Sequence, residues 1–238
     1  MVSDRDYIFF DVDDTLIEWV TRWDDAFVEA ARSVGVEVSP ERALQALDHA
    51  IAIFYEECVR EHHARGDPEA FWLDYDSRVL EMLGVGERSR EAAARVADLM
   101  TRPEAMRLYP EVPQVLESLS AGGARLGIVT GRPRAAPDLE RLGVLRYFAP
   151  VLDAFSVGSA KAAGRMFRVA AEVAAESERV GWHVGDTYDS DVLGARASGL
   201  RPVLVDRDGR HQKVDCPRVE DLRGLLDVIA SCSEEGDR

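Results

Sequence analysis

Two aspartates separated by one residue follow a short apolar run near the start of the chain, where Tyr7-Ile8-Phe9-Phe10 leads into Asp11-Val12-Asp13. A carboxylate can attack phosphorus and form an aspartyl-phosphate, which divides one difficult step into two easier ones. A second acid two residues later can protonate the leaving oxygen and afterwards activate water. Taken alone, an Asp-x-Asp pair after a strand is more often a turn or a helix cap than a nucleophile.

Further polar residues follow later apolar runs. Thr130-Gly131 and Asp186 come directly after such runs, Asp191 lies just beyond, and Lys161 follows another run after a short loop. Ligands of open α/β sheets bind beyond the carboxyl ends of the strands, so we expect these groups to join Asp11 in one site. Carboxylates hold Mg²⁺, and the metal and a lysine offset the repulsion between an attacking carboxylate and a phosphate. A Thr hydroxyl and a backbone N–H complete the phosphate cradle.

The lysine is unusual in this composition. Lys161 and Lys213 are the only lysines in the chain, and the rest of the 29 Lys and Arg residues are arginines. A lone loop lysine is usually solvated, but its rarity here favours a function. Asp186 and Asp191 also have a plainer interpretation as caps of the following helix, for which Ser190 is the predicted N-cap.

The elements that must position these residues alternate along the chain. Strands buried on both faces are predicted at Tyr7–Phe10, Leu126–Val129, Val151–Phe155, Val180–Val184 and Pro202–Val205. Helical patterns lie between most of them. The alternation predicts an α/β fold with a doubly wound, mostly parallel, Rossmann-like sheet flanked by helices.

The stretch from about Ile17 to Arg102 departs from this alternation, because it contains no predicted strand. Helical patterns cover roughly Trp23–Val34, a stripe from Leu44 to Cys58 with its start at Pro40, Pro68–Leu83 and Ser89–Met100. We therefore expect an α/β core of residues 1–16 and 104–238 and an inserted, all-helical domain at 17–103. Within the insert, His62-His63 is interpreted as a surface helix end and not as a metal site, because adjacent helical residues point in different directions.

Composition excludes several classes of partner. The 238 residues carry a net charge of −15, which repels nucleic acid and anionic lipid, so a phosphate site needs its own local positive charge. No apolar run approaches membrane-spanning length, and no signal-type segment follows the N-terminus. Cys58, Cys216 and Cys232 form neither a disulfide framework nor a metal motif, so a reducing, cytoplasmic location is expected. The oligomeric state is not readable from the sequence.

Together these segments resemble the haloacid dehalogenase (HAD) superfamily of phosphohydrolases over nearly the whole chain. Asp11-Val12-Asp13-Asp14-Thr15-Leu16 matches the first motif, and Ile128-Val129-Thr130-Gly131 matches the second. Lys161 matches the third, and Gly185-Asp186 with Asp191 matches the fourth, G-D-x-x-x-x-D. The helical insert after the first motif is similar to the C1 cap of the subfamily I phosphatases, which closes over small substrates.

The resemblance implies a role for each matched residue. Asp11 would be the nucleophile and a Mg²⁺ ligand, and Asp13 would be the general acid/base and lend its backbone carbonyl to the metal. Thr130 and the Gly131 amide would bind the phosphoryl oxygens. Lys161 would hold nucleophile and phosphate together. Asp186 would be the third protein ligand, with Asp191 in or beside the metal shell.

The implied activity is Mg²⁺-dependent hydrolysis of a small phosphorylated metabolite. The acid at Asp13 favours phosphate esters over carbon–halogen bonds, because the family's dehalogenases generally lack it. The third motif departs from the usual Lys-Pro-x-Pro, since Lys161 is followed by Ala162-Ala163-Gly164, a less rigid loop that leaves a silent binding protein open. A sugar phosphomutase and a 2-haloacid dehalogenase-like hydrolase also remain open. A receiver domain is disfavoured, because its acceptor aspartate lies on a later strand than Asp11.

Overall fold

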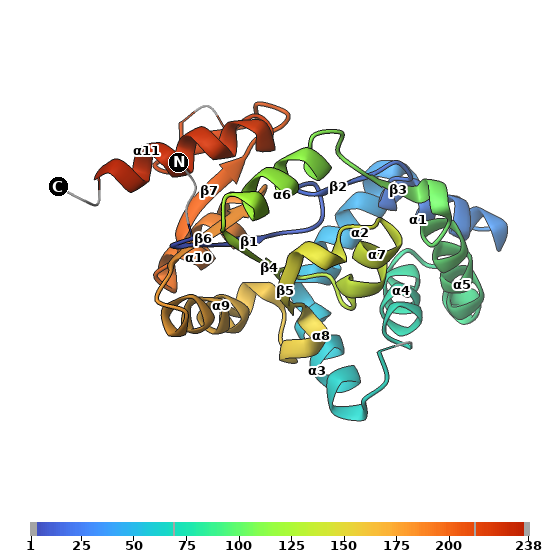
Figure 1. Cartoon of the computed structure of the whole chain (residues 1–238). Helices are drawn as coiled ribbons and strands as arrows, with labels where there is room; N and C mark the ends of the chain where they lie inside the picture. The colour runs from blue at the N-terminus through green and yellow to red at the C-terminus, as the bar shows by residue number, and fades with distance from the viewer. Residues whose placement is uncertain (1–3, 69, 212, 236–238) are drawn as a thin grey trace. The chain divides into compact units, whose positions relative to one another are not determined.

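The computed structural model describes residues 4–68, 70–211 and 213–235. The chain divides into two compact units (Figure 1). The core unit comprises the residues up to Glu18 and those from Leu108 onward, and the helical unit comprises Trp19–Arg107. A six-stranded parallel sheet forms the centre of the core unit, and helices α1–α5 form the helical unit. The predicted α/β fold with a helical insertion is confirmed.

The sheet has the strand order β5-β4-β1-β6-β7-β8, and every neighbouring pair is parallel. Its strands are β1 (Asp6–Phe10), β4 (Arg125–Val129), β5 (Phe148–Leu152), β6 (Val180–Gly185), β7 (Arg201–Val205) and β8 (Arg218–Val219). From β1 the chain adds β4 and β5 on one side and then returns to add β6, β7 and β8 on the other. The ends of β1, β4 and β6 therefore meet at the switch point where ligands bind in such sheets.

All five residues of β1 are buried, as expected for the strand at the centre of a sheet. Tyr7 and Phe9 belong to a core cluster with Phe167 of α9 (Arg165–Glu176), so this side of the strand packs against that helix. Gly127 of β4 makes room for the cluster, because a Cβ there would lie 2.7 Å from the Phe9 ring. The remaining helices of the core unit are α6 (Val112–Ala121), α7 (Ala135–Arg141), α8 (Ala154–Val157), α10 (Leu193–Ala197) and α11 (Leu225–Glu235).

Two predicted boundaries in the core unit are wrong. The strand predicted at Val151–Phe155 is β5, which ends at Leu152 and does not reach Phe155. The Asp153 carboxylate accepts the Ser156 N–H there and caps α8. Ser190 is not an N-cap; it lies inside the π-helix η5 (Tyr188–Val192), which starts after Thr187. That turn is set instead by Asp191, whose backbone N–H donates to the Thr187 carbonyl at 2.8 Å.

The helical unit contains α1 (Trp23–Ser33), α2 (Pro40–Ile53), α3 (Tyr55–Arg65), α4 (Phe71–Met82) and α5 (Ser89–Met100), drawn from blue to green in Figure 1. The predicted stripe from Leu44 to Cys58 is broken at Phe54, whose φ of −138° and ψ of 0° separate α2 from α3. The buried face of α2 is formed by alanines, whereas Leu44 and Ile51 are exposed. Strands β2 (Ile17–Trp19) and β3 (Met106–Leu108) form a separate two-stranded sheet that the sequence pattern did not predict.

His62 and His63 lie in the last turn of α3, as predicted, and His63 is exposed, but the predicted exposure of His62 is wrong. His62 is buried, its Nδ1 lies 3.2 Å from the Asp67 carbonyl, and its Nε2 lies 3.3 Å from the Asp74 carboxylate. Trp23 packs between two other indoles, with ring centroids 5.3 Å from Trp19 and 5.4 Å from Trp72. These side chains therefore have packing roles inside the helical unit.

Across the described residues, no helix combines the length and the apolar character that crossing a bilayer requires. Cys58 and Cys216 are free thiols, and the Cys232 side chain lies outside the described part of the chain.

Candidate active site

Asp11 follows β1 directly and is fixed at the edge of the sheet. Its backbone N–H donates to the Val184 carbonyl of β6 at 2.8 Å, which continues the ladder between the two strands. The side chain is buried. Burial raises the pKa of Asp11 well above its usual range, although the Lys161 ammonium acts in the opposite direction.

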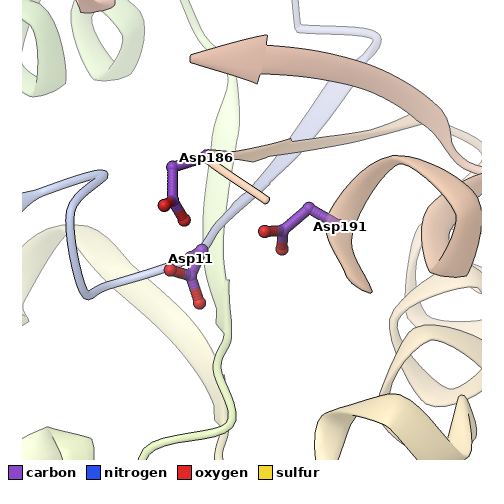
Figure 2. Close-up of side chains that lie close together, drawn as sticks. All are labelled: Asp11, Asp186 and Asp191. Carbon is purple, nitrogen blue, oxygen red and sulfur yellow. The ribbon is translucent and has the colours of Figure 1, made fainter. Parts of the chain in front are cut away.

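Asp186 and Asp191 bring two further carboxylates close to that of Asp11, as Figure 2 shows. Carboxylate oxygens of Asp11, Asp186 and Asp191 lie within 4.8 Å of one another. Gly185 permits this approach, because a Cβ at that position would lie 2.2 Å from the Asp191 carboxyl carbon. Burial and the nearby carboxylates of Asp191 and Asp14 raise the pKa of Asp186 to about 7.

Asp191 is the most firmly held of these acids. Its two oxygens accept from the Thr187 N–H at 3.0 Å and pair with Nε2 of His183 at 2.7 Å. Despite burial, Lys161 and His183 hold the pKa of Asp191 below its usual range. His183 is fully buried, its Nδ1 has no hydrogen-bond partner in the described part of the chain, and burial lowers its pKa. The neutral ring therefore carries its proton on Nε2 and donates to Asp191.

Lys161 links two of the three acids. Its Nζ lies 2.5 Å from an oxygen of Asp11 and 2.5 Å from an oxygen of Asp191. Burial disfavours the charged amine, but the two carboxylates more than compensate and raise the pKa of Lys161. Three buried or half-buried carboxylates thus face one ammonium group, which leaves an excess of negative charge.

The unusual loop after Lys161 is an ordered turn. Residues Lys161–Ala163 form a 3₁₀ turn, η4, and the Gly164 N–H closes it on the Lys161 carbonyl at 3.0 Å. Gly164 has a φ of +72°, which is costly for other residues. A proline at 164 would lack the N–H and could not adopt this φ. The turn after Lys161 is thus closed by a glycine N–H that a proline could not supply, and Lys161 contacts the carboxylates of Asp11 and Asp191.

Thr130 and Gly131 follow β4. Thr130 is buried, and its backbone N–H donates to the Leu152 carbonyl at 3.0 Å. Gly131 lies against the lysine, because a Cβ added there would be 3.5 Å from the Lys161 Cβ. The second and third motifs therefore meet at the same place.

Asp13 lies on the loop after β1, and its partner is a residue that the sequence motifs did not reveal. Nη1 of Arg132 lies 2.8 Å from an oxygen of Asp13. Nε and Nη2 of Arg132 lie 3.1 and 2.6 Å from one oxygen of Asp138. The Arg132 side chain is 9% exposed, whereas those of Asp13 and Asp138 are 36% and 27% exposed. The tripeptide Thr130-Gly131-Arg132 was the available signal, but an arginine-rich chain makes any single arginine uninformative.

A second arginine holds the backbone just beyond Asp13. Asp14 has a φ of +55°, unusual for a residue other than glycine. Arg207 donates to the Asp14 carbonyl at 3.2 Å and to the Thr15 carbonyl at 2.8 Å. Its Nη1 lies 2.8 Å from the Glu111 carboxylate. These contacts fix the conformation of the loop that carries Asp13.

The donor set of the site fits a hard divalent cation. Asp11, Asp186 and Asp191 supply carboxylate oxygens at close range, and such oxygens are the ligands that Mg²⁺ prefers. The excess of carboxylates over ammonium groups also favours a bound cation, because it would relieve their mutual repulsion.

Comparisons with known proteins agree with this arrangement. A model of the haloacid dehalogenase-like hydrolase family matches residues 6–199. The chain is 29% identical to a phosphoserine phosphatase of Thermus thermophilus, over 92% of this chain and 97% of the relative. It is 28% identical to a glyceraldehyde 3-phosphate phosphatase of Methanopyrus kandleri, over 96% and 98%. The crystal structure of a 2-haloacid dehalogenase from Pseudomonas syringae pv. Tomato DC3000 matches with a TM-score of 0.62 at 25% identity and covers 97% of this chain and 99% of that one.

Proposed function

This chain belongs to the haloacid dehalogenase-like hydrolase family, and we propose that it hydrolyses small phosphomonoesters with Mg²⁺ through an aspartyl-phosphate on Asp11. The observation that carries the proposal is the contact of Lys161 Nζ with the Asp11 carboxylate, beside Asp186 and Asp191. A carboxylate nucleophile, a cation against it and a cluster of metal-binding acids are the parts that phosphoryl transfer to an aspartate requires.

In the proposed mechanism, Asp11 attacks phosphorus while Lys161 orients nucleophile and phosphate and lowers their repulsion. The Thr130 hydroxyl and the Gly131 N–H bind phosphoryl oxygens. Asp11, Asp186, Asp191 and the Asp13 carbonyl would hold Mg²⁺, which when bound would neutralise charge on the phosphoryl oxygens. The burial of the site supports these assignments, since electrostatic interactions are stronger where water is excluded.

Asp13 acts as general acid and then as general base. As the bond between Asp11 and phosphorus forms and the ester bond breaks, the protonated Asp13 gives its proton to the leaving oxygen, which departs as an alcohol. Asp13 then takes a proton from the water that attacks the aspartyl-phosphate, which releases phosphate and restores the Asp11 carboxylate. Its place two residues after Asp11 supports this role.

We propose further that residues 17–103 act as a cap domain, with residues 1–16 and 104–238 as the catalytic core. The compactness of each unit and the β2–β3 pairing, where the chain leaves and re-enters the core, support this division. Movement of such a cap would admit substrate and then exclude bulk water.

The proposed substrate is a small phosphorylated metabolite, without nucleic acid or membrane as partner, in a cytoplasmic setting. The similarity to a phosphoserine phosphatase and to a glyceraldehyde 3-phosphate phosphatase supports this class of substrate, although the two relatives act on different phosphate esters. Because the net charge of −15 repels an anionic substrate at long range, binding of a phosphate ester would depend on local cations such as Lys161.

Dehalogenation is the second candidate, favoured by the similarity to the Pseudomonas syringae 2-haloacid dehalogenase. Asp13 argues against it, because displacement of a halide needs no proton on the leaving group. Release of chloride from a 2-chloro acid, with no phosphate released from esters, would establish this alternative.

The proposal is tested by hydrolysis of an aryl phosphate with and without Mg²⁺, for the wild type and for Asp11→Asn. We expect Mg²⁺-dependent release of phosphate by the wild type alone. Equal rates for the two proteins would contradict the assignment of Asp11, and transfer of phosphate between positions of a sugar phosphate would indicate a mutase. No turnover across a panel of metabolite phosphates would favour a silent binding protein.

A further inference from the structure

Arg132 connects the acid/base Asp13 to a fixed point of the core unit. Nη1 of its guanidinium donates to Asp13 at 2.8 Å, and Nε and Nη2 donate to Asp138 at 3.1 and 2.6 Å. Asp13 and Arg132 are 119 residues apart in the sequence and come from the loops after β1 and β4. Because a guanidinium is planar with a rigid fork of donors, the Asp138 contacts fix the direction in which Nη1 meets Asp13.

The loop that carries Arg132 is itself anchored at both ends. The Arg132 N–H donates to the Thr130 hydroxyl oxygen at 3.2 Å, which ties the start of the loop to β4. The Ala135 N–H donates to the Asp153 carboxylate at 3.2 Å, which ties the start of α7 to the end of β5. Asp138 lies on that helix. The position of Arg132 is therefore set by two strand ends and a helix.

Asp13 needs such a partner more than Asp11 does. Asp11 is buried at a strand end, whereas the Asp13 side chain is 36% exposed and lies on a loop. A half-exposed aspartate samples several rotamers, and each wrong rotamer removes the acid from the line of proton transfer. A buried arginine that holds one carboxylate oxygen selects a single orientation.

We propose that Arg132 is the positioning residue that orients Asp13 for proton transfer to the leaving group, with Asp138 as its anchor. This rests on the proposed phosphatase function. Arg132 makes no bond to phosphorus and transfers no proton. It acts on the step in which the ester oxygen takes the Asp13 proton as its bond to phosphorus breaks, and on the later step in which Asp13 takes a proton from water.

The alternative is that Arg132 only ties two loops together, and the dependence on leaving group separates the two roles. An ester with a poor leaving group, such as an alkyl phosphate, needs the proton from Asp13, whereas 2,4-dinitrophenyl phosphate departs without it. Loss of orientation therefore lowers kcat/KM for the alkyl ester far more than for the dinitrophenyl ester. A loosened loop would lower both values alike.

The experiment compares Arg132→Met with Arg141→Met on both esters with saturating Mg²⁺. Arg141 is the matched control, because it also pairs with Asp138, at 3.4 Å, and has no recorded contact with Asp13 among the described residues. We expect Arg132→Met to lose about 10–100-fold more kcat/KM on the alkyl phosphate than on the dinitrophenyl phosphate, and Arg141→Met to behave as wild type. Asp13→Asn should show the same pattern more strongly, and the double variant with Arg132→Met should be no worse than Asp13→Asn alone.

Equal losses on the two esters, or additive losses in the double variant, overturn the proposal while the phosphatase function stands. A wild type that hydrolyses neither ester overturns the phosphatase function and this proposal with it. Thermal unfolding checks that each variant is folded. If Arg132→Met does not fold, Asp138→Asn carries the test, since it frees the anchor and keeps the arginine; we then expect the same dependence on leaving group, about tenfold, and its absence overturns the proposal.

Discussion

The strand-end acids and the loop acid of this site are held in different ways. We call Asp11, Asp186, Asp191 and Lys161 the metal corner, and Asp13, Arg132 and Asp138 the acid–base corner. In the metal corner, Asp11 and Asp191 are 6% and 1% exposed and are fixed by backbone hydrogen bonds next to β1 and β6. In the acid–base corner, the Asp13 side chain is 36% exposed and depends on an arginine from another loop.

The difference teaches how one site can serve two chemical demands. The metal corner brings like charges together in a buried or half-buried place, where the pKa values of Asp11 and Asp186 are raised and a bound cation would relieve the repulsion. In the proposed mechanism the acid–base corner delivers a proton to the leaving group and accepts one from water, and its greater exposure suits that exchange. Substitutions should therefore affect either metal binding or proton transfer, and the following predictions test that separation.

Asp13→Asn should have the largest effect among tests that spare the metal corner. We expect kcat to fall by roughly 10²–10⁴-fold, while Mg²⁺ affinity changes little because the proposed contribution of Asp13 to the metal is its backbone carbonyl. Titration calorimetry with Mg²⁺ measures the change in Mg²⁺ affinity. Asp14→Asn is the control, since asparagine tolerates the positive φ of that position. If Asp13→Asn weakens Mg²⁺ binding as much as Asp186→Asn does, the two corners are not separate.

Lys161→Met should damage the metal corner in two ways. Turnover should fall by about 10²–10³-fold, because the cation between nucleophile and phosphate is lost. The metal-free protein should also unfold at a lower temperature, because the Asp11 and Asp191 carboxylates lose their partner, and Mg²⁺ should restore part of that loss. Lys213→Met, the change of the only other lysine, serves as control. An unchanged melting temperature without metal would show that Lys161 does not balance these charges.

His183→Phe should weaken Mg²⁺ binding about tenfold, because Asp191 loses the Nε2–H donor that orients it. A phenyl ring can replace the imidazole beside Phe167, whose ring lies 4.8 Å away, so the packing there is largely kept. His183→Gln keeps an N–H donor and should lose less. A phenylalanine variant with the Mg²⁺ affinity of the wild type would show that His183 does not support metal binding through Asp191.

The smallest expected effect concerns pH and stability without metal. The folded-state pKa of Asp186, about 7, lies above its unfolded value near 4, so the folded protein binds the extra proton between these values. Stability from this group is present at low pH and lost as pH rises through about 7. The melting temperature in a chelator should thus fall by a few degrees between about pH 5 and pH 8, and the rise on adding Mg²⁺ should be larger at pH 8. Asp186→Asn should flatten this dependence; a profile identical to that of the wild type would contradict it.

The metal corner could be predicted from the sequence because each of its residues follows a recognisable apolar strand. Short, near-continuous apolar runs identify such strands, and the parallel topology of the sheet then brings their carboxyl ends together. The raised pKa of Asp186 could not be predicted, since it depends on the burial of the carboxylate and on the nearby charges of Asp191 and Asp14. The end of β5 was misjudged because the Asp153 cap overrides the apolar character of Phe155.

The acid–base corner was only half predictable. Asp13 is part of a motif, but Arg132 is one arginine in a chain with two lysines and many arginines, and its partner lies 119 residues away. In the helical unit, the stripe of large apolar residues did not identify the buried face of α2. That face is formed by Ala43, Ala46 and Ala50, whereas Leu44 is exposed. The burial of His62 could not be predicted because it depends on contacts with Asp67 and Asp74, which the helical spacing does not indicate.

The central claim is that Asp11 carries the phosphoryl group during turnover. The most direct measurement mixes the enzyme with Mg²⁺ and excess aryl phosphate, treats it with borohydride during turnover, and analyses its peptides by mass spectrometry. Borohydride reduces an acyl phosphate to an alcohol, so the account predicts conversion of Asp11 to homoserine, dependent on both substrate and Mg²⁺. An active enzyme whose Asp11 stays unmodified, or whose reduction occurs at another aspartate, would contradict the account.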